Sequence, residues 1–181
     1  MRIGFRIVYF FFLIFGVSAS AEAGQILSFG FHSATLGRDW HYNAYIPDGY
    51  NGSKLRYPVM YLLHGYSEDE NTWVGKGRVG ATIDRLIANG DVPPILIVMP
   101  ASGNSWYVDA KEKYESAFIN DLLPEIEQRF RTLVDREGRA IGGDSMGGYG
   151  SLRFILKYPE KFSAAMLMIS KSRRKLGLST S

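Results

Sequence analysis

Short apolar segments that alternate with amphipathic ones constrain the fold of this 181-residue chain more than any other feature. Two of them read YPVMYLL and ILIVMP, continuous apolar runs that are typical of parallel strands covered on both faces. Between them, residues 77–90 place Val79, Ile83 and Ile87 at helical spacing and end at Gly90. This order predicts a crossover helix between two parallel strands.

The same alternation continues toward the C-terminus. The segment SAFINDLLPEIEQRF predicts a second helix, which Pro124 kinks or in which it begins a new turn. GRAIGGDS predicts a third parallel strand, MGGYGSLRFILKYP a helix that ends at Pro159, and FSAAMLMIS a fourth parallel strand. Upstream, alternation in QILSFGFHS and WHYNAYIP predicts an antiparallel hairpin with a turn near residues 36–38. The expected class is α/β, with a mostly parallel sheet and an N-terminal antiparallel hairpin.

Length and composition favour one globular domain, because the chain is 46% hydrophobic and 14% aromatic. Residues 1–21 combine a charged start, an apolar run from Ile7 to Val17 and small residues at Ala19 and Ala21, which is the pattern of a secretory signal peptide. The apolar run is shorter than a membrane span, although an uncleaved anchor is the alternative. We therefore expect a periplasmic or secreted protein with no stable membrane span after cleavage, a domain over residues 22–170 and an unstructured basic tail over residues 171–181.

The formal net charge of +3 comes from the two ends of the chain. The predicted signal carries two positive charges and residues 171–181 carry four, so removing these six from +3 leaves −3 for the remainder. A nucleic-acid partner is not expected, because such partners need a basic face on the folded domain.

The segment GGDSMGGYG holds Ser145 between a predicted strand and a predicted helix. Gly143-Asp144-Ser145-Met146-Gly147 matches Gly-x-Ser-x-Gly, and this context is the one that a nucleophile elbow requires. The sharp turn strains the serine backbone, and glycines at 143 and 147 avoid a collision. At a helix N-terminus the backbone N–H of Met146 can face a developing negative charge. The alternative is a serine that only caps the helix.

A second backbone donor is expected from the loop after the first parallel strand, in YLLHGYSEDENTW. Gly65 permits a tight bend there, and the N–H of Tyr66 would point toward the serine. His64 either fixes this loop or acts as a general base, and the first role is favoured.

Together these segments resemble the esterase D and antigen 85-like branch of the α/β-hydrolases, which includes feruloyl esterases and S-formylglutathione hydrolases. The resemblance runs from about Ser33 to Ser170 and also includes SATLGRDWHYNAYIPDGY, NSWYVD and AIGGDSMGGYGSLRFILKYPEKF. It implies a serine carboxylic-ester hydrolase with Ser145 as nucleophile, an oxyanion hole made by the backbones of Tyr66 and Met146, and no cofactor. The implied substrate is a small-molecule or carbohydrate-linked ester.

The resemblance also implies that Trp106 and Tyr107 border the acyl or alcohol pocket, with ordinary core packing as the alternative. Asp109 is interpreted as a residue that fixes the loop rather than as the acid of a triad, because it precedes the serine.

The activating residues are missing from the expected positions. In this fold an acid and then a histidine follow the serine, but after Ser145 the sequence has neither histidine nor aspartate. Glu160 lies about 18 Å away along the helix. We therefore expect a reading frame truncated or shifted near Ser170, an impaired triad, and an exposed edge strand at residues 162–169 that lowers solubility.

Three other functions stay open. An acyltransferase would share the elbow and differ in its alcohol acceptor, and a non-catalytic remnant or ester-binding module would not turn over esters at all. A metal-dependent hydrolase is disfavoured, because three scattered histidines do not form a ligand set.

Overall fold

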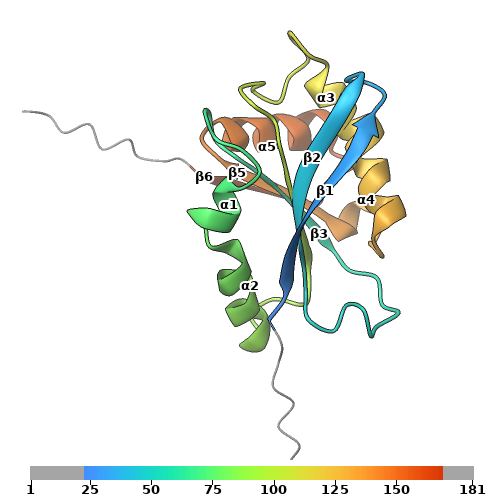
Figure 1. The fold of residues 1–181 in the computed structure, drawn as a ribbon, viewed down its shortest axis with the longest axis vertical. Coiled ribbons are helices and arrows are strands. Elements are labelled where there is room, and N and C mark those ends of the chain that lie inside the picture. The colour runs from blue at the N-terminus through green and yellow to red at the C-terminus, as the bar shows by residue number, and fades with distance from the viewer. Residues whose placement is uncertain (1–22, 169–181) are drawn as a thin grey trace, which may run out of the picture.

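The computed structural model describes residues 23–168, which form one mixed six-stranded sheet with helices on both faces (Figure 1). The predicted signal peptide and the predicted basic tail lie outside the described residues. The strands are β1 (Gln25–Ser33), β2 (Arg38–Ile46), β3 (Val59–Leu63), β4 (Leu96–Pro100), β5 (Arg139–Asp144) and β6 (Ala164–Met168). The helices are α1 (Thr72–Gly75), α2 (Val79–Ala88), α3 (Tyr114–Ala117), a π-helix (Phe118–Leu122), α4 (Leu123–Arg129), a 3₁₀ turn (Arg136–Gly138) and α5 (Met146–Lys157).

The order of the strands is β1-β2-β4-β3-β5-β6. β1 and β2 form the predicted antiparallel hairpin, with Gln25 opposite Ile46 and Ser33 opposite Arg38. β2 joins the remaining strands by antiparallel pairing with β4, and β3 to β6 are parallel to one another. The predicted α/β class and the predicted hairpin are thus confirmed.

Two apolar layers hold the helices to the sheet. On one face α3, the π-helix, α4 and α5 cover a core that includes Tyr61, Phe118 and Phe154. On the other face α1 and α2 pack Trp73 and Ile83 against a smaller cluster. Both faces of β4 are therefore covered and all five of its residues are buried, which is why its sequence is apolar without alternation.

The second predicted helix differs in detail from the expectation. The helical segment begins at Tyr114 and passes through the π-turn of residues 118–122 before α4. Pro124 lies in the first turn of α4, directly after the π-turn. The proline thus begins a new turn, as one of the two expected outcomes had it.

The last described strand is shorter than expected. β6 begins at Ala164, whereas Phe162 is fully buried in the larger core before the strand starts. Because this ring packs in the core, it fixes the position of the segment between α5 and β6. β6 pairs only with β5 among the described strands, and its Met166 and Leu167 are 44% and 45% exposed.

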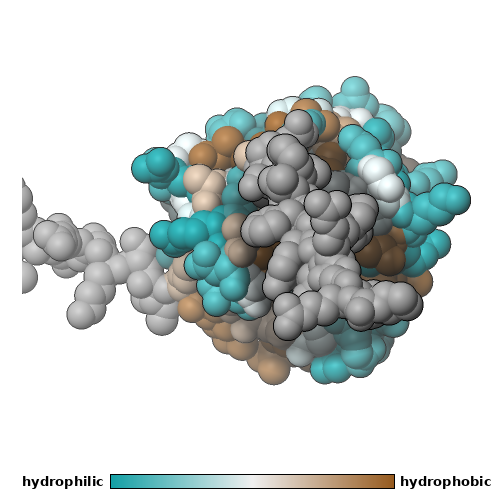
Figure 2. Space-filling view, turned by 90° about the horizontal axis from the view of Figure 1, so that it is seen from below, coloured by the Kyte–Doolittle hydropathy of each residue, from teal (hydrophilic) through white to brown (hydrophobic). Residues whose placement is uncertain are grey.

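In the view from below, hydrophilic and hydrophobic residues alternate over the coloured part of the surface (Figure 2). Among residues 23–168, no helix is long and apolar enough to cross a membrane.

The sheet order brings two loops together. β3 is connected forward to β4 on one side of it, and β5 lies on its other side, so the chain changes direction between β3 and β5. Such a switch point opens a crevice at the carboxyl ends of the strands. Leu63 lies opposite Gly143, so the loop after β3 begins beside the turn after β5.

Candidate active site

Ser145 lies in a strained turn between β5 and α5. Its backbone has φ 53° and ψ −112°, a conformation that residues with a side chain rarely adopt. The turn is held because the Ser145 N–H donates to the carbonyl of Met168 on β6 at 3.0 Å. Ser145 itself is exposed, so its hydroxyl is accessible from solvent.

The glycines that flank Ser145 make this turn possible. A Cβ atom on Gly143 would lie 2.5 Å from the carbonyl carbon of Gly147, and one on Gly147 would lie 2.3 Å from the carbonyl oxygen of Leu63. Both distances are far below van der Waals contact and involve backbone atoms, which cannot move aside cheaply. The first turn of α5 can therefore pass the ends of β3 and β5 only without side chains at these positions.

Met146 is the first residue of α5, so its N–H has no partner within the helix. Its side chain is fully buried in the core, which fixes the direction of the backbone at that point. Within residues 23–168 its N–H donates no hydrogen bond. A free backbone N–H beside an exposed hydroxyl is suited to accept a negative oxygen.

His64 is fully buried and fixes the loop after β3. Its Nδ1 lies 2.8 Å from the Gly65 carbonyl, and its Nε2 accepts from the Ser102 N–H at 3.0 Å. A carbonyl can only accept and an N–H can only donate, so the neutral ring carries its proton on Nδ1. Both ring nitrogens are therefore occupied by the protein, which agrees with a loop-fixing role and leaves no free nitrogen for a general base.

Tyr66 follows on the same loop. Its side chain is 55% exposed, and its N–H donates no hydrogen bond within the described part of the chain. A Cβ atom on the preceding Gly65 would lie 3.6 Å from the Asp144 carbonyl oxygen, so this loop contacts the turn that holds Ser145. The structure thus brings together two backbone donors, those of Tyr66 and Met146, and one exposed hydroxyl.

In the loop after β4, two adjacent aromatic side chains point in opposite directions, one toward solvent and one into the core. Trp106 and Tyr107 have φ 54° and 56°, both in the left-handed region. Trp106 is 47% exposed, whereas Tyr107 is fully buried. Tyr107 thus packs in the core, the alternative given for it, and of the two rings only that of Trp106 faces outward.

Tyr107 instead supports the site from the core. Its hydroxyl donates to the His64 carbonyl at 3.0 Å, and burial raises the pKa of the phenol, which keeps the donor protonated. Gly150 makes room for the ring, since a Cβ atom there would lie 2.6 Å from it. This glycine of GGDSMGGYG therefore has a packing reason.

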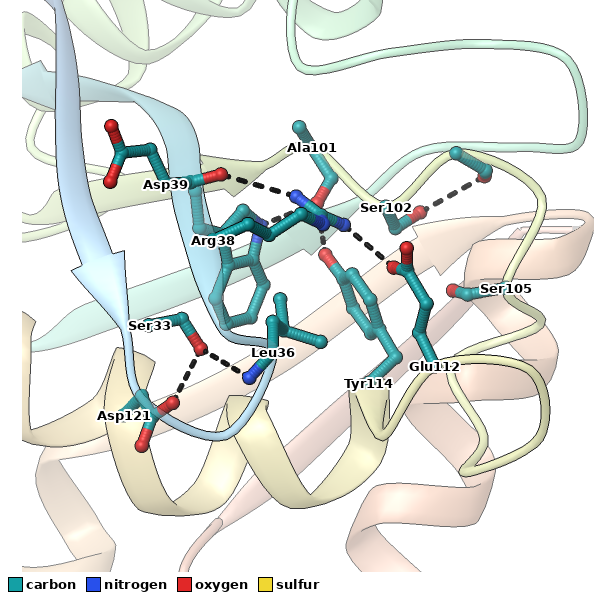
Figure 3. A network of polar contacts seen from close by, with 12 residues as sticks. Ser33, Leu36, Arg38, Asp39, Ala101, Ser102, Ser105, Glu112, Tyr114 and Asp121 are labelled. Atoms are coloured by element: carbon teal, nitrogen blue, oxygen red, sulfur yellow. Dashed lines mark hydrogen bonds and ion pairs between the residues drawn. The ribbon is translucent and has the colours of Figure 1, made fainter.

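The start of the same loop is anchored to the hairpin, as Figure 3 shows. The Ala101 carbonyl accepts from the indole N–H of Trp40 at 2.7 Å and from the Tyr114 hydroxyl. Farther along, Arg38 pairs with Glu112 at 2.7 Å. Asp121 on the π-helix accepts from the hydroxyl of Ser33 at 2.5 Å, and this serine accepts from the Leu36 N–H at the hairpin turn (Figure 3). These contacts tie both ends of the loop after β4 to neighbouring elements.

Three exposed rings lie next to one another, and one of them follows Ser145 on α5. The ring of Trp106 lies 6.2 Å from that of Tyr66 and 5.8 Å from that of Tyr149, measured between centroids. Tyr149 is 47% exposed and lies one helical turn after Ser145, to whose carbonyl its N–H donates at 3.0 Å. No motif singles out Tyr149 in the sequence, although an aromatic residue four positions after the serine is a signal that could have found it. We call Tyr66, Trp106 and Tyr149 the aromatic rim.

A groove of about 490 Å³ continues beyond Trp106. Its walls combine this ring with hydroxyl, amide and charged side chains: Arg38, Ser102, Asn104, Ser105, Lys111 and Glu112. Ring faces and polar groups side by side suit a ligand that is partly flat and partly polar.

The other titratable groups do not reach Ser145. His32 and His41 lie in the hairpin, and His32 contacts Asp39 at 3.1 Å. β2 is three strand positions from β5, which places the hairpin backbone about 14 Å from the serine strand. Asp109 accepts from the N–H of Ser116 at 2.9 Å, and although burial opposes it, this pairing holds the Asp109 pKa below its ordinary value. Within residues 23–168, no three His, Cys, Asp or Glu side chains gather to hold a metal ion.

A strained serine between a parallel strand and a helix, in a sheet covered on both faces, defines the class of α/β-hydrolase folds. Residues 33–172 match the family described as "Putative esterase", and the chain belongs to that esterase family.

Relatives and solved structures agree with this assignment. An endo-1,4-beta-xylanase/feruloyl esterase of Xylanibacter ruminicola is 35% identical over 149 residues, which is 77% of this chain and 20% of that protein. A solved ferulic acid esterase is similar with a TM-score of 0.74 and 31% identity, covering 79% of this chain and 58% of the other. An S-formylglutathione hydrolase from Staphylococcus aureus is similar with a TM-score of 0.63 and 26% identity, covering 79% and 58%. The chain therefore spans well under two thirds of the length of these proteins.

Proposed function

We propose that this chain hydrolyses carboxylic esters through an acyl-enzyme formed on Ser145. The observation that carries the proposal is the exposed hydroxyl in a strained turn, together with two backbone N–H groups near that turn that donate no hydrogen bond within residues 23–168. Membership of an esterase family supports it. In the first step the serine oxygen attacks the ester carbonyl, the hydroxyl proton leaves, and the N–H groups of Tyr66 and Met146 stabilise the tetrahedral oxyanion. Collapse expels the alcohol, and water then cleaves the acyl-enzyme.

The fate of the hydroxyl proton sets the expected rate. We propose that none of the three histidines of this chain accepts this proton, because His64 is buried with both nitrogens occupied and the other two lie in the hairpin. The proton therefore passes to solvent. We propose slow turnover, because positioning and oxyanion stabilisation alone retain only about 10³-fold to 10⁴-fold of catalysis over water.

This proposal predicts an unusual dependence on pH. Turnover of p-nitrophenyl acetate should rise about tenfold per pH unit between about pH 6 and 9, because hydroxide replaces the missing base. Added imidazole should increase the rate of the wild type beyond its effect on Ser145→Ala. A plateau near neutral pH would indicate an internal base, and equal rates for wild type and Ser145→Ala would indicate a non-catalytic ester-binding module.

We propose that the acyl group is aromatic. The ring of Trp106 lies 5.8 Å from that of Tyr149 and 6.2 Å from that of Tyr66, and Tyr149 follows Ser145 by one helical turn, so these rings can contact a flat acyl group. The feruloyl esterases among the similar proteins act, by their names, on an aromatic acyl group. The groove beyond Trp106 would then hold the polar alcohol, which includes the option of a sugar.

Trp106→Ala should raise KM for methyl ferulate about fivefold, because one stacked ring contributes about 1 kcal/mol. KM for p-nitrophenyl acetate should stay within about twofold, since an acetyl group does not reach the ring. Trp106→Phe keeps a ring and should lose less. Equal losses on both esters would instead mean that the indole stabilises the loop and does not contact the acyl group.

Transfer of the feruloyl group to an added alcohol in preference to water would reassign the chain as an acyltransferase.

We also propose that the protein is exported, on the basis of the signal-peptide pattern in residues 1–21. N-terminal sequencing of the protein recovered outside the cytoplasm tests this, and a chain that still begins at Met1 would contradict it.

A further inference from the structure

We infer that Glu68 and Asn104 are positioning residues that fix the oxyanion loop, residues 64–67, and leave the N–H of Tyr66 free for the substrate. The inference rests on the proposed function and names two residues that no motif of the sequence singles out. Glu68 lies just after the oxyanion loop, and Asn104 lies in the loop after β4. Each accepts a hydrogen bond from a backbone N–H next to Tyr66.

The contacts surround Tyr66 on both sides. The carboxylate of Glu68 accepts from the Gly65 N–H at 2.9 Å, and the amide oxygen of Asn104 accepts from the Ser67 N–H at 2.8 Å. The Gly65 carbonyl is held by His64 at 2.8 Å. Among residues 64–67, the backbone groups around Tyr66 are thus engaged by side chains, while the Tyr66 N–H donates no hydrogen bond within the described chain.

The conformation of the loop explains why side chains are needed to hold it. Ser67 has φ 60°, in the left-handed region that residues with a Cβ atom avoid. A Cβ atom on Gly65 would lie 3.0 Å from the Glu68 carboxylate, so glycine lets this acceptor approach the backbone closely. The bonds to Gly65 and Ser67 therefore hold a turn that the chain would not keep on its own.

The charge of Glu68 is compensated. A bare carboxylate near the oxyanion loop would repel the negative charge that forms on the substrate oxygen. Lys76 lies 3.1 Å from the other oxygen of Glu68 and neutralises it. Because Lys76 is 77% exposed, this ion pair is worth little in water, and the contact with the Gly65 N–H is the one that matters for position.

Two pairs of variants test the inference in the full 181-residue chain. Glu68→Ala and Asn104→Leu remove the acceptors, whereas Glu68→Gln and Asn104→Asp keep an oxygen at the same place. We expect kcat for p-nitrophenyl acetate to fall about tenfold to a hundredfold in the first pair, somewhat less than the loss of a whole oxyanion donor, with KM within about twofold. The second pair should stay within about threefold of the wild type.

Matched controls separate position from charge and from folding. Lys76→Met removes the ion pair but leaves the bond to Gly65, and should lower kcat far less than Glu68→Ala, because this exposed pair compensates little of the charge in water. Glu70→Ala removes a carboxylate from the same loop that makes no hydrogen bond or ion pair in the described structure, and should also keep kcat. If Glu68→Ala does not fold, Asn104→Leu and its partner Asn104→Asp decide, because Asn104 lies in a different loop.

A second readout does not depend on turnover. Phenylboronic acid forms a B–O bond to the serine oxygen, releases the hydroxyl proton to water and places one boron hydroxyl where the oxyanion forms. Its dissociation constant should rise in Glu68→Ala and Asn104→Leu by a factor similar to the fall in kcat.

The outcomes are distinguishable. If Ser145→Ala matches the wild type in turnover and in boronate binding, the proposed function and this inference both fail. If Ser145 is required but Glu68→Ala and Asn104→Leu match the wild type, the inference alone is overturned. If Glu68→Gln loses as much as Glu68→Ala, the residue acts through its charge and the positioning role is also overturned.

Discussion

Gly147 lies where the first turn of α5 passes the end of β3. A Cβ atom there would lie 2.3 Å from the Leu63 carbonyl oxygen, so Gly147→Ala must displace one of the two backbones. We expect the free energy of unfolding to fall by about 2 kcal/mol or more, measured by urea denaturation. Gly75→Ala is the matched control, since a Cβ atom on Gly75 would meet nothing within 4 Å. Equal stability of the two variants would show that the turn is looser than described.

At the scale of residues, a motif predicts a position when the backbone itself dictates the residue type. Gly143, Ser145 and Gly147 belong to such a motif, and the distances above give the physical reason. Trp106 and Tyr107 do not, because neighbours in a loop with left-handed backbone can face opposite ways, and the sequence says nothing of which ring turns inward. Glu68 and Asn104 escape prediction for a related reason: an acceptor for a backbone N–H is chosen by loop geometry.

At the scale of elements, α3 and α5 are joined by a buried carboxylate. Glu115 on α3 is almost fully buried and accepts from Arg153 on α5 at 2.8 Å and from the Tyr158 hydroxyl at 2.8 Å, and it also pairs with Lys157. Burial disfavours the charged form of Glu115, but these donors outweigh it and hold the pKa below its ordinary value of 4.5. The far end of α5, the helix that follows Ser145, is thus tied to α3.

The lowered pKa of Glu115 predicts how stability depends on pH. A group whose pKa is lower in the folded state contributes stability above its unfolded pKa, and this contribution is lost as pH falls from about 4.5 through the folded value. At pH 7 we expect Glu115→Gln to lower the free energy of unfolding by about 1–3 kcal/mol, a range reduced because Arg153 and Lys157 are partly exposed. The difference from wild type should shrink below pH 4.5.

Denaturant titrations at several pH values measure this difference. Glu160→Gln is the control, because Glu160 is exposed and makes no contact in the described residues. A gap between wild type and Glu115→Gln that persists to pH 3 would mean that the carboxylate contributes by packing alone.

Elements were predictable where one periodicity dominates. β4 is continuously apolar because it is covered on both faces, whereas in the hairpin the exposed positions lie mainly in β1 and at the start of β2, and residues 42–45 are all buried. The π-turn of residues 118–122 could not be predicted from the sequence. Tyr114, Phe118 and Leu122 are all buried in the core, and their spacing of four residues is the one that an ordinary α-helix would also show. Likewise, the apolar side chain of Phe162 suggested that the strand begins there. In the structure Phe162 packs into the core before β6 begins at Ala164.

At the scale of the whole molecule, the class of fold followed from alternating strands and helices, but the distances between loops did not. The order β1-β2-β4-β3-β5 places the oxyanion loop beside the turn that holds Ser145, and the hairpin histidines three and four strand positions from β5. That order decides which titratable groups can act together, and it arises from crossovers on opposite faces of the sheet. The sequence therefore predicted the nucleophile and one loop, whereas their supports required the structure.

The edge of the sheet predicts self-association. In the described chain β6 pairs only with β5 and exposes Met166 and Leu167, and open apolar edges favour pairing between molecules. Leu167→Lys should reduce light scattering at a given protein concentration, because a charge on an edge strand opposes such pairing. Leu55→Lys makes the same change at a loop residue that is 69% exposed, and should have little effect. A similar reduction by both variants would point to general solubility rather than to the edge.

The backbone N–H of Ser145 donates to the Met168 carbonyl on β6, the last described strand of the sheet. Mild heating that separates β6 from β5 would therefore release Ser145 from its strained turn while the aromatic core stays packed. Inactivation should then begin several degrees before the near-ultraviolet circular dichroism of the buried tyrosines collapses.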